Sequence, residues 1–116
     1  DVRAAAEFYG PLLETLGSKE LLRAEWGVGY GPDTLGFFAM RAYDGRAATA
    51  GNGAHVAFTA ASTSEVDDFH RVALERGGRC AGAPGSREAL GPNTYAAFVY
   101  DPFGNKLEAI YGGFAA

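Results

Sequence analysis

Two residues in the second half of the chain, His55 and Glu108, carry side chains that could hold a metal ion. An imidazole and a carboxylate together suit a borderline divalent ion such as Zn, Ni, Mn, Fe or Co. The simpler alternatives are a histidine at the start of a strand with its ring bonded to a loop, and a solvent-facing carboxylate beside Lys106. Which alternative holds depends on the elements that carry the two side chains.

Alternating polar and apolar residues predict strands at both positions. In segment 55–60, HVAFTA, the face with His55 also carries Ala57 and Thr59. Glu108 lies between Leu107 and Ala109, which we expect to pack outward against a helix, so Glu108 should point inward. An unpaired carboxylate there would be costly.

The remaining elements of the second half follow from its turn and capping signals. Ser62 and Glu65 form a capping-box pair that predicts a helix, and Gly77-Gly78 ends it. Further strands are predicted at 79–81, 94–100 and 105–111, with a long loop around 82–93. The sequence DPFGN at 101–105 predicts a hairpin turn.

The first half shows a similar pattern without an opening strand. Apolar residues at helical spacing predict a helix from Val2 to Leu16, closed by Gly17. Strands are predicted at 19–26, 28–30 and 35–43. Residues 47–54 are small and are typical of a linker between two halves.

The two halves repeat each other at nearly fixed offsets. A shift of 61 places Phe8 on Phe69 and Gly17 on Gly78, and a shift of 70 places Tyr30 on Tyr100 and Phe38 on Glu108. We therefore predict an α+β fold of two βαβββ modules in a single domain, 1–116, with module one at 1–46 and module two at 55–116. The opening strand of module one is missing, because the counterpart of His55 falls about six residues before Asp1.

Composition excludes several classes of function. A chain of 116 residues with a net charge of −4 has no basic run, which argues against nucleic acid as a partner. No stretch is long and apolar enough to span a membrane. A single cysteine, Cys80, and the lack of a signal peptide favour the cytoplasm. No glycine-rich phosphate motif follows a strand, so nucleotide cofactors are not indicated.

Together, HVAFTA at 55–60, FYGPLLETLG at 8–17 and YAAFVYDPFGNKLE at 95–108 resemble the vicinal oxygen chelate superfamily. This superfamily contains glyoxalase I, extradiol dioxygenases and bleomycin-resistance proteins, and the chain looks most similar to small glyoxalase-like bacterial members. The resemblance implies two modules that form an incomplete barrel around one cup, and a homodimer. It also implies a divalent metal held by His55, Glu108 and a histidine before Asp1. A fourth ligand is ruled out because Phe38 occupies that position.

Strand parity suggests which residues would line such a cup for a small-molecule substrate. Phe38 and Met40 should share the inner face of their strand, and Thr59 should flank His55. Trp26, Arg87 and Tyr95 are further candidates. Arg87 could bind an anionic group bidentately, although a surface salt bridge is an equal alternative.

The resemblance implies a metal-dependent enzyme acting on a small oxygen-bearing molecule, by lyase, isomerase or related chemistry. Glu108 would then be both a ligand and a base. One alternative is a metal-free protein that binds small molecules or drugs, as bleomycin-resistance proteins do. A second is a non-catalytic domain that acts through oligomer contacts. Fold alone does not decide among them.

Overall fold

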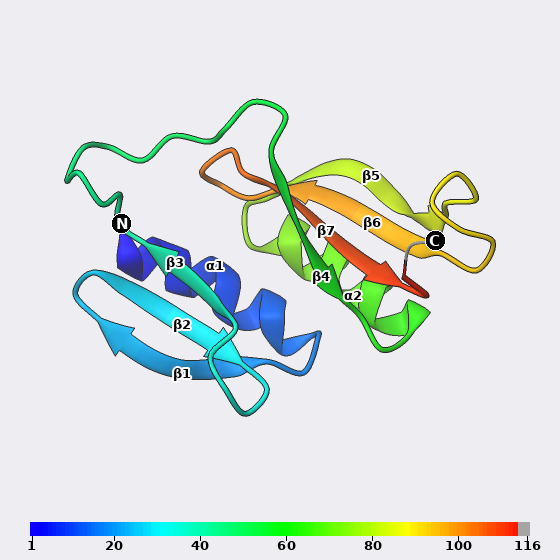
Figure 1. Ribbon diagram of the computed structural model, residues 1–116, viewed down its shortest axis with the longest axis horizontal. Coiled ribbons are helices and arrows are strands. Elements are labelled where there is room, and N and C mark those ends of the chain that lie inside the picture. The colour runs from blue at the N-terminus through cyan, green and yellow to red at the C-terminus, as the bar shows by residue number, and fades with distance from the viewer. Residues whose placement is uncertain (114–116) are drawn as a thin grey trace.

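The computed structural model describes residues 1–113 and contains two helices and two sheets (Figure 1). The first half comprises α1 (Val2–Glu14), β1 (Lys19–Ala24), β2 (Gly27–Gly31) and β3 (Phe37–Met40). The second half comprises β4 (His55–Thr59), α2 (Thr63–Glu75), β5 (Arg79–Ser86), β6 (Tyr95–Tyr100) and β7 (Lys106–Tyr111).

The strands of each half form their own sheet. Sheet A has the order β1-β2-β3 and is antiparallel, whereas sheet B has the order β4-β7-β6-β5. In sheet B the pairing of β4 with β7 is parallel, and the other pairs are antiparallel. Within residues 1–113 the strands do not close into a barrel, which confirms the predicted α+β class and its open cup.

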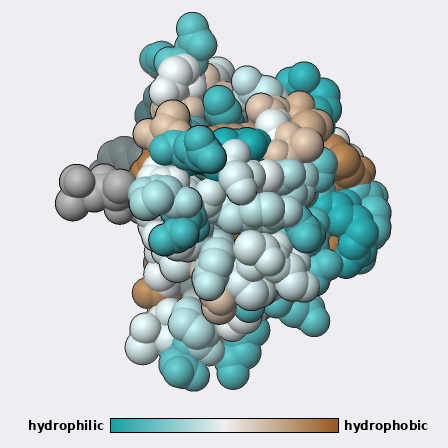
Figure 2. Space-filling model, turned by 90° about the vertical axis from the view of Figure 1, so that its right-hand side faces the viewer, coloured by the Kyte–Doolittle hydropathy of each residue, from teal (hydrophilic) through white to brown (hydrophobic). Residues whose placement is uncertain are grey.

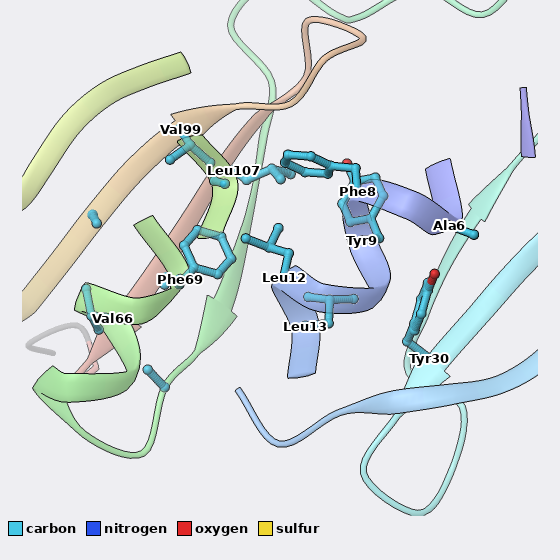
Figure 3. Packing of buried hydrophobic residues seen from close by; sticks show 14 of the residues in the cluster. Ala6, Phe8, Tyr9, Leu12, Leu13, Tyr30, Val66, Phe69, Val99 and Leu107 are labelled. Carbon is cyan, nitrogen blue, oxygen red and sulfur yellow. The ribbon is translucent and has the colours of Figure 1, made fainter. Parts of the chain in front are cut away.

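One hydrophobic cluster joins both halves of the chain. Figure 3 shows Leu12 of α1 beside Phe69 of α2, with Leu107 of β7 nearby, and all three side chains are buried. From sheet A, Val28 and Tyr30 join the same cluster. The helices therefore pack on one face of each sheet.

The predicted loop around residues 82–93 is wrong in its first part, because β5 continues as far as Ser86. Its pairing with β6 shifts register between Cys80 and Gly82, and again between Gly82 and Gly85. Such bulges accommodate extra residues within a strand. Glycine and proline in the sequence AGAPGS therefore mark bulges here, not the end of the strand.

The repeat is also offset by one residue from its predicted register in β2. Tyr30 pairs with Phe37, and the equivalent pair in sheet B is Val99 with Leu107. Tyr30 therefore corresponds to Val99 and not to Tyr100, because the β6–β7 connection is one residue longer. The correspondence of Phe38 with Glu108 is retained, since each follows a core-packed residue.

A groove of about 740 Å³ lies beside β3, between the first turns of α1 and strand β4. Its apolar walls include Val2, Ala5, Phe37, Val56 and Leu107. In sheet B, the equivalent place beside β7 is occupied by β4.

The surface seen in Figure 2 is mostly hydrophilic or neutral, with hydrophobic residues only in small, separate areas. In the part of the chain that the structure describes, neither helix combines the length and the apolar character that a membrane-spanning helix needs.

The start of α2 shows the predicted capping box. Ser62 Oγ accepts a hydrogen bond from Glu65 N at 3.1 Å, and Glu65 Oε1 accepts one from Ala61 N at 2.9 Å. We expect Ser62→Ala to lower the free energy of unfolding by about 1 kcal/mol, because a helix amide loses its acceptor. Urea denaturation measures this, with Ser64→Ala, an exposed position in the same helix, as the control. Equal effects of the two substitutions would contradict the assignment.

Candidate functional site

His55 and Glu108 meet on the face of sheet B that points away from α2, here called the open face. In the parallel pairing of β4 with β7, His55 lies opposite Lys106 and Ala57 lies opposite Glu108. Side chains two residues apart on one strand share a face, so His55 and Glu108 are diagonal neighbours. His55 Nε2 lies 3.0 Å from Glu108 Oε1.

Glu108 is almost completely buried, with 1% of its surface exposed, as the pattern of Leu107 and Ala109 predicted. Its second oxygen, Oε2, has no hydrogen-bond partner among the described residues. A buried carboxylate oxygen without a partner is unfavourable, and a bound cation would remove this cost. The His55 side chain is 42% exposed, so the pair is open to solvent on the histidine side.

These two donors fit part of a metal site. Residues 1–113 contain no group of three or more His, Cys, Asp or Glu side chains that could hold an ion together. Phe38, at the position equivalent to Glu108, lies on β3 and has no donor atom. The structure thus brings together a histidine nitrogen and a carboxylate, which are both ligands of first-row divalent metals.

Phe98 of β6 lies beside this pair and was not predicted as a site residue. The centroid of its ring is 6.2 Å from the centroid of His55, and it pairs with Glu108 across the strands. Arg87 Cζ lies 5.6 Å from the same ring centroid, and Lys106 Nζ lies 5.3 Å from it. Arg87 is therefore on the open face, together with Lys106, which was not a predicted site residue.

The aromatic candidates of the first half are Phe38, which lies on β3, and Trp26, which lies in the turn between β1 and β2. The rings of Trp26 and Phe38 are stacked, with centroids 6.0 Å apart and planes 30° apart. Both side chains are exposed, as is Met40 on the same face of β3. Thr59 shares the open face of sheet B with His55 at the far end of β4.

Tyr95 lies on the opposite face of sheet B from His55, which differs from the expected place on the cup wall. Its hydroxyl donates a hydrogen bond to Asp67 Oδ1 of α2 at 2.6 Å, and that hydrogen bond raises the pKa of Tyr95. Tyr95 shares its face with Ala97 and Val99, which are buried in the core. Both faces of β6 carry apolar side chains, so the pattern of polar and apolar residues does not predict which face points into the cup.

His70 and Cys80 are in contact although they come from different elements. His70 Nε2 of α2 lies 3.2 Å from Cys80 Sγ at the start of β5. Burial lowers the pKa of His70 below its ordinary value. No pattern in the sequence indicates this contact, because a helix end and a turn separate the two residues. His70 lies away from the open face, as predicted.

Asp101 holds the β6–β7 hairpin that leads into the strand of Glu108. Its carboxylate is buried and accepts hydrogen bonds from Phe103 N at 2.9 Å and Asn105 N at 2.8 Å. Asn105 Nδ2 donates a third at 2.9 Å, and the hydroxyl of Tyr9 in α1 donates a fourth. Burial and the neighbouring Asp101 carboxylate raise the pKa of Tyr9. The hairpin was predicted from its residues, but the tie to α1 was not.

The chain is similar to a known protein family in sequence and in structure. The family model described as "Glyoxalase/Bleomycin resistance protein/Dioxygenase superfamily" matches residues 1–109. A glyoxalase/bleomycin resistance protein from Albidiferax ferrireducens is 32% identical, with a TM-score of 0.85 over 96% of this chain and 89% of its own.

More distant structures share the fold. A glyoxalase-related enzyme from Fulvimarina pelagi is 20% identical, with a TM-score of 0.68 over 97% of this chain and 81% of its own. A lactoylglutathione lyase from Agrobacterium tumefaciens is 22% identical, with a TM-score of 0.61 over 97% and 86% of the two chains. Among curated proteins, none matches the chain.

Proposed function

Because the chain belongs to the glyoxalase/bleomycin resistance protein/dioxygenase superfamily, we propose that it is a metal-dependent enzyme for a small oxygen-bearing organic molecule. The observation that carries the proposal is the buried Oε2 of Glu108, which has no hydrogen-bond partner within residues 1–113 and lies beside the exposed ring of His55. The proposed reaction class is that of a lyase, an isomerase or a related enzyme.

His55 and Glu108 are the residues that would hold the divalent ion, which would be Zn, Ni, Mn, Fe or Co. When bound, such an ion acts as a Lewis acid toward oxygen atoms of the substrate. The ligand set is open, because two protein donors leave most coordination positions free for a further protein ligand and for substrate.

Glu108 is also proposed to act as the general base. Glu108 would do so when it is displaced from the ion, because Oε2 is the carboxylate atom that His55 does not contact and could then take a proton from the substrate. Burial of Glu108 limits the access of bulk water to that proton. Trp26, Phe38, Met40 and Thr59 are proposed to contact the organic part of the substrate.

The first test is metal binding by the purified protein. We expect titration with Zn²⁺ or Mn²⁺ in a calorimeter to show one site, and His55→Ala to weaken it at least tenfold because a nitrogen ligand is lost. His70→Ala is the matched control, since His70 is the other histidine and lies away from the open face. Equal metal affinity in wild type and His55→Ala would contradict the proposed site.

The second candidate function is metal-free binding of small apolar molecules. It is favoured by the stacked, exposed rings of Trp26 and Phe38 with Met40 beside them. Such a protein would bind its ligand without added metal, and Glu108→Gln would not change that affinity. For either function we propose a cytoplasmic location, which the single, unpaired thiol of Cys80 supports. We also propose a homodimer, which the family resemblance supports.

A further inference from the structure

We infer that the open face of sheet B recognises a ligand with a carboxylate group, which Arg87 and Lys106 bind next to the His55–Glu108 pair. The inference rests on the proposed function in one respect, namely that this ligand is the substrate of the same site. It adds a substrate class, the small carboxylic acids, and two residues that select for it.

The two faces of sheet B differ in charge. The open face carries Arg79, Arg87 and Lys106, which lie over the rings of Tyr100 and Phe98. None of these three cations forms an ion pair within the described range, 1–113. The acid on the same face, Glu108, is buried and faces His55. The other face is covered by α2, which carries the acidic side chains Glu65, Asp67, Asp68 and Glu75.

This concentration of positive charge is unusual for the chain as a whole, which has a net charge of −4. Unpaired cations on one wall of a site attract anionic ligands and raise their local concentration. A divalent ion at His55 and Glu108 would increase the positive charge further.

The head group of Arg87 is held in a fixed position. Its guanidinium folds back along β5, where Nη2 donates a hydrogen bond to the carbonyl oxygen of Ala83 at 2.6 Å. It lies where Gly82 and Gly85 have no side chain: a Cβ at Gly82 would come within 3.4 Å of Nη2, and one at Gly85 within 3.3 Å of Nη1. The two glycines thus form a cradle for the guanidinium against Phe98.

In this position some N–H groups of the guanidinium make no hydrogen bond within residues 1–113. Arg87 donates to Ala83 and, at 3.5 Å, to the carbonyl oxygen of Ser86. A guanidinium has five N–H donors, so several remain for a ligand, and its planar fork matches a carboxylate. The side chain is pre-positioned, and therefore less conformational entropy is lost when a ligand binds.

Lys106 lies next to both proposed metal ligands in sheet B. Lys106 lies directly opposite His55 across the β4–β7 pair and two residues before Glu108 on its own strand. Its ammonium group is 5.3 Å from the centroid of Phe98, the ring that His55 and Arg87 also approach. Arg87, Lys106 and His55 thus all lie around one ring, and a small molecule bound at Phe98 would be near each of them.

The test compares two probes of the same size that differ in charge, glycolate and its neutral amide glycolamide. Binding is followed by two-dimensional ¹H–¹⁵N NMR titration of the protein, with and without Zn²⁺. We expect glycolate to bind at least tenfold more tightly than glycolamide. We expect Arg87→Met and Lys106→Met each to weaken glycolate binding about tenfold, because a charge-assisted hydrogen bond is lost, and to leave glycolamide unaffected.

Arg71→Met is the matched control, because it removes one positive charge from α2 on the other side of sheet B. It should change neither affinity. Arg87→Lys keeps the charge but loses the fork, and should bind glycolate with intermediate affinity. If a variant fails to fold, the preference of the wild-type protein for glycolate over glycolamide without Zn²⁺ still tests the carboxylate site, because no metal ion can then account for it.

Equal affinity for the two probes, no detectable glycolate binding, or a glycolate affinity unchanged in folded Arg87→Met and Lys106→Met would each overturn the inference. A different result would contradict the proposed function, namely that the wild-type protein does not bind Zn²⁺. In that case a glycolate preference that persists without Zn²⁺ and depends on Arg87 would still support the carboxylate site.

Discussion

Glu108→Gln is expected to lower the affinity for Zn²⁺ or Mn²⁺ by roughly 100-fold or more, the largest effect of any single substitution at the site. Loss of a residue that only supports a metal ligand costs 10- to 100-fold, so loss of a ligand itself should reach at least the upper end of that range. The amide of glutamine has no negative charge, and of its two terminal atoms only the oxygen can coordinate a cation.

The same substitution separates a metal ligand from a structural carboxylate. Because Oε2 lacks a partner in the described part of the chain, Glu108→Gln removes a buried charge and should not lower the melting temperature of the metal-free protein appreciably. Calorimetric titration and thermal unfolding measure the two effects on the same samples. Glu75→Gln, at an exposed carboxylate of α2, is the control. A stability loss with unchanged metal affinity would show that Glu108 is structural.

Asp101→Ala is expected to lower the free energy of unfolding by about 3–5 kcal/mol, since four donors lose a charged acceptor in a buried position. That is a large part of the roughly 5–15 kcal/mol that typically stabilises a domain. The loss should affect both halves, because Tyr9 belongs to α1 and Asp101 to the β6–β7 hairpin.

Urea denaturation measures the effect, and Asp33→Ala is the matched control because Asp33 is an exposed aspartate in the equivalent β2–β3 connection. Tyr9→Phe removes only the hydroxyl and should cost less than Asp101→Ala. If Tyr9→Phe has no effect on stability while Asp101→Ala does, the carboxylate serves the hairpin alone and does not tie it to α1.

The sequence was sufficient for features that depend on periodicity and local signals. The capping box at Ser62 and Glu65, the two helices and the inward orientation of Glu108 all follow from residues near one another in the chain. The repeat also identified the elements of both modules. Its register in β2 was wrong by one residue because a difference in connection length does not show in composition.

Features that depend on distant residues could not be predicted in the same way. The cradle of Arg87 requires that β5 carry bulges and that Phe98 stand beside Gly82, and a glycine-rich segment is equally typical of a loop. Tyr95 was misplaced because neighbouring residues on both faces of β6 are apolar. The contact of Tyr9 with Asp101 spans 92 positions and leaves no local pattern.

The position of β4 at the edge of sheet B has a dynamic consequence for the His55–Glu108 pair. β4 has one neighbour, β7, within residues 1–113, and four of its five residues are exposed, whereas β7 lies inside the sheet and is mostly buried. Edge strands with little buried surface open locally at a small fraction of the global unfolding free energy. Glu108 is thus held by a buried inner strand, while His55 is carried by an edge strand whose amides we expect to exchange faster with solvent. An ion bound to both residues would hold β4 against β7. Binding of the ion and ordering of β4 would then be thermodynamically coupled.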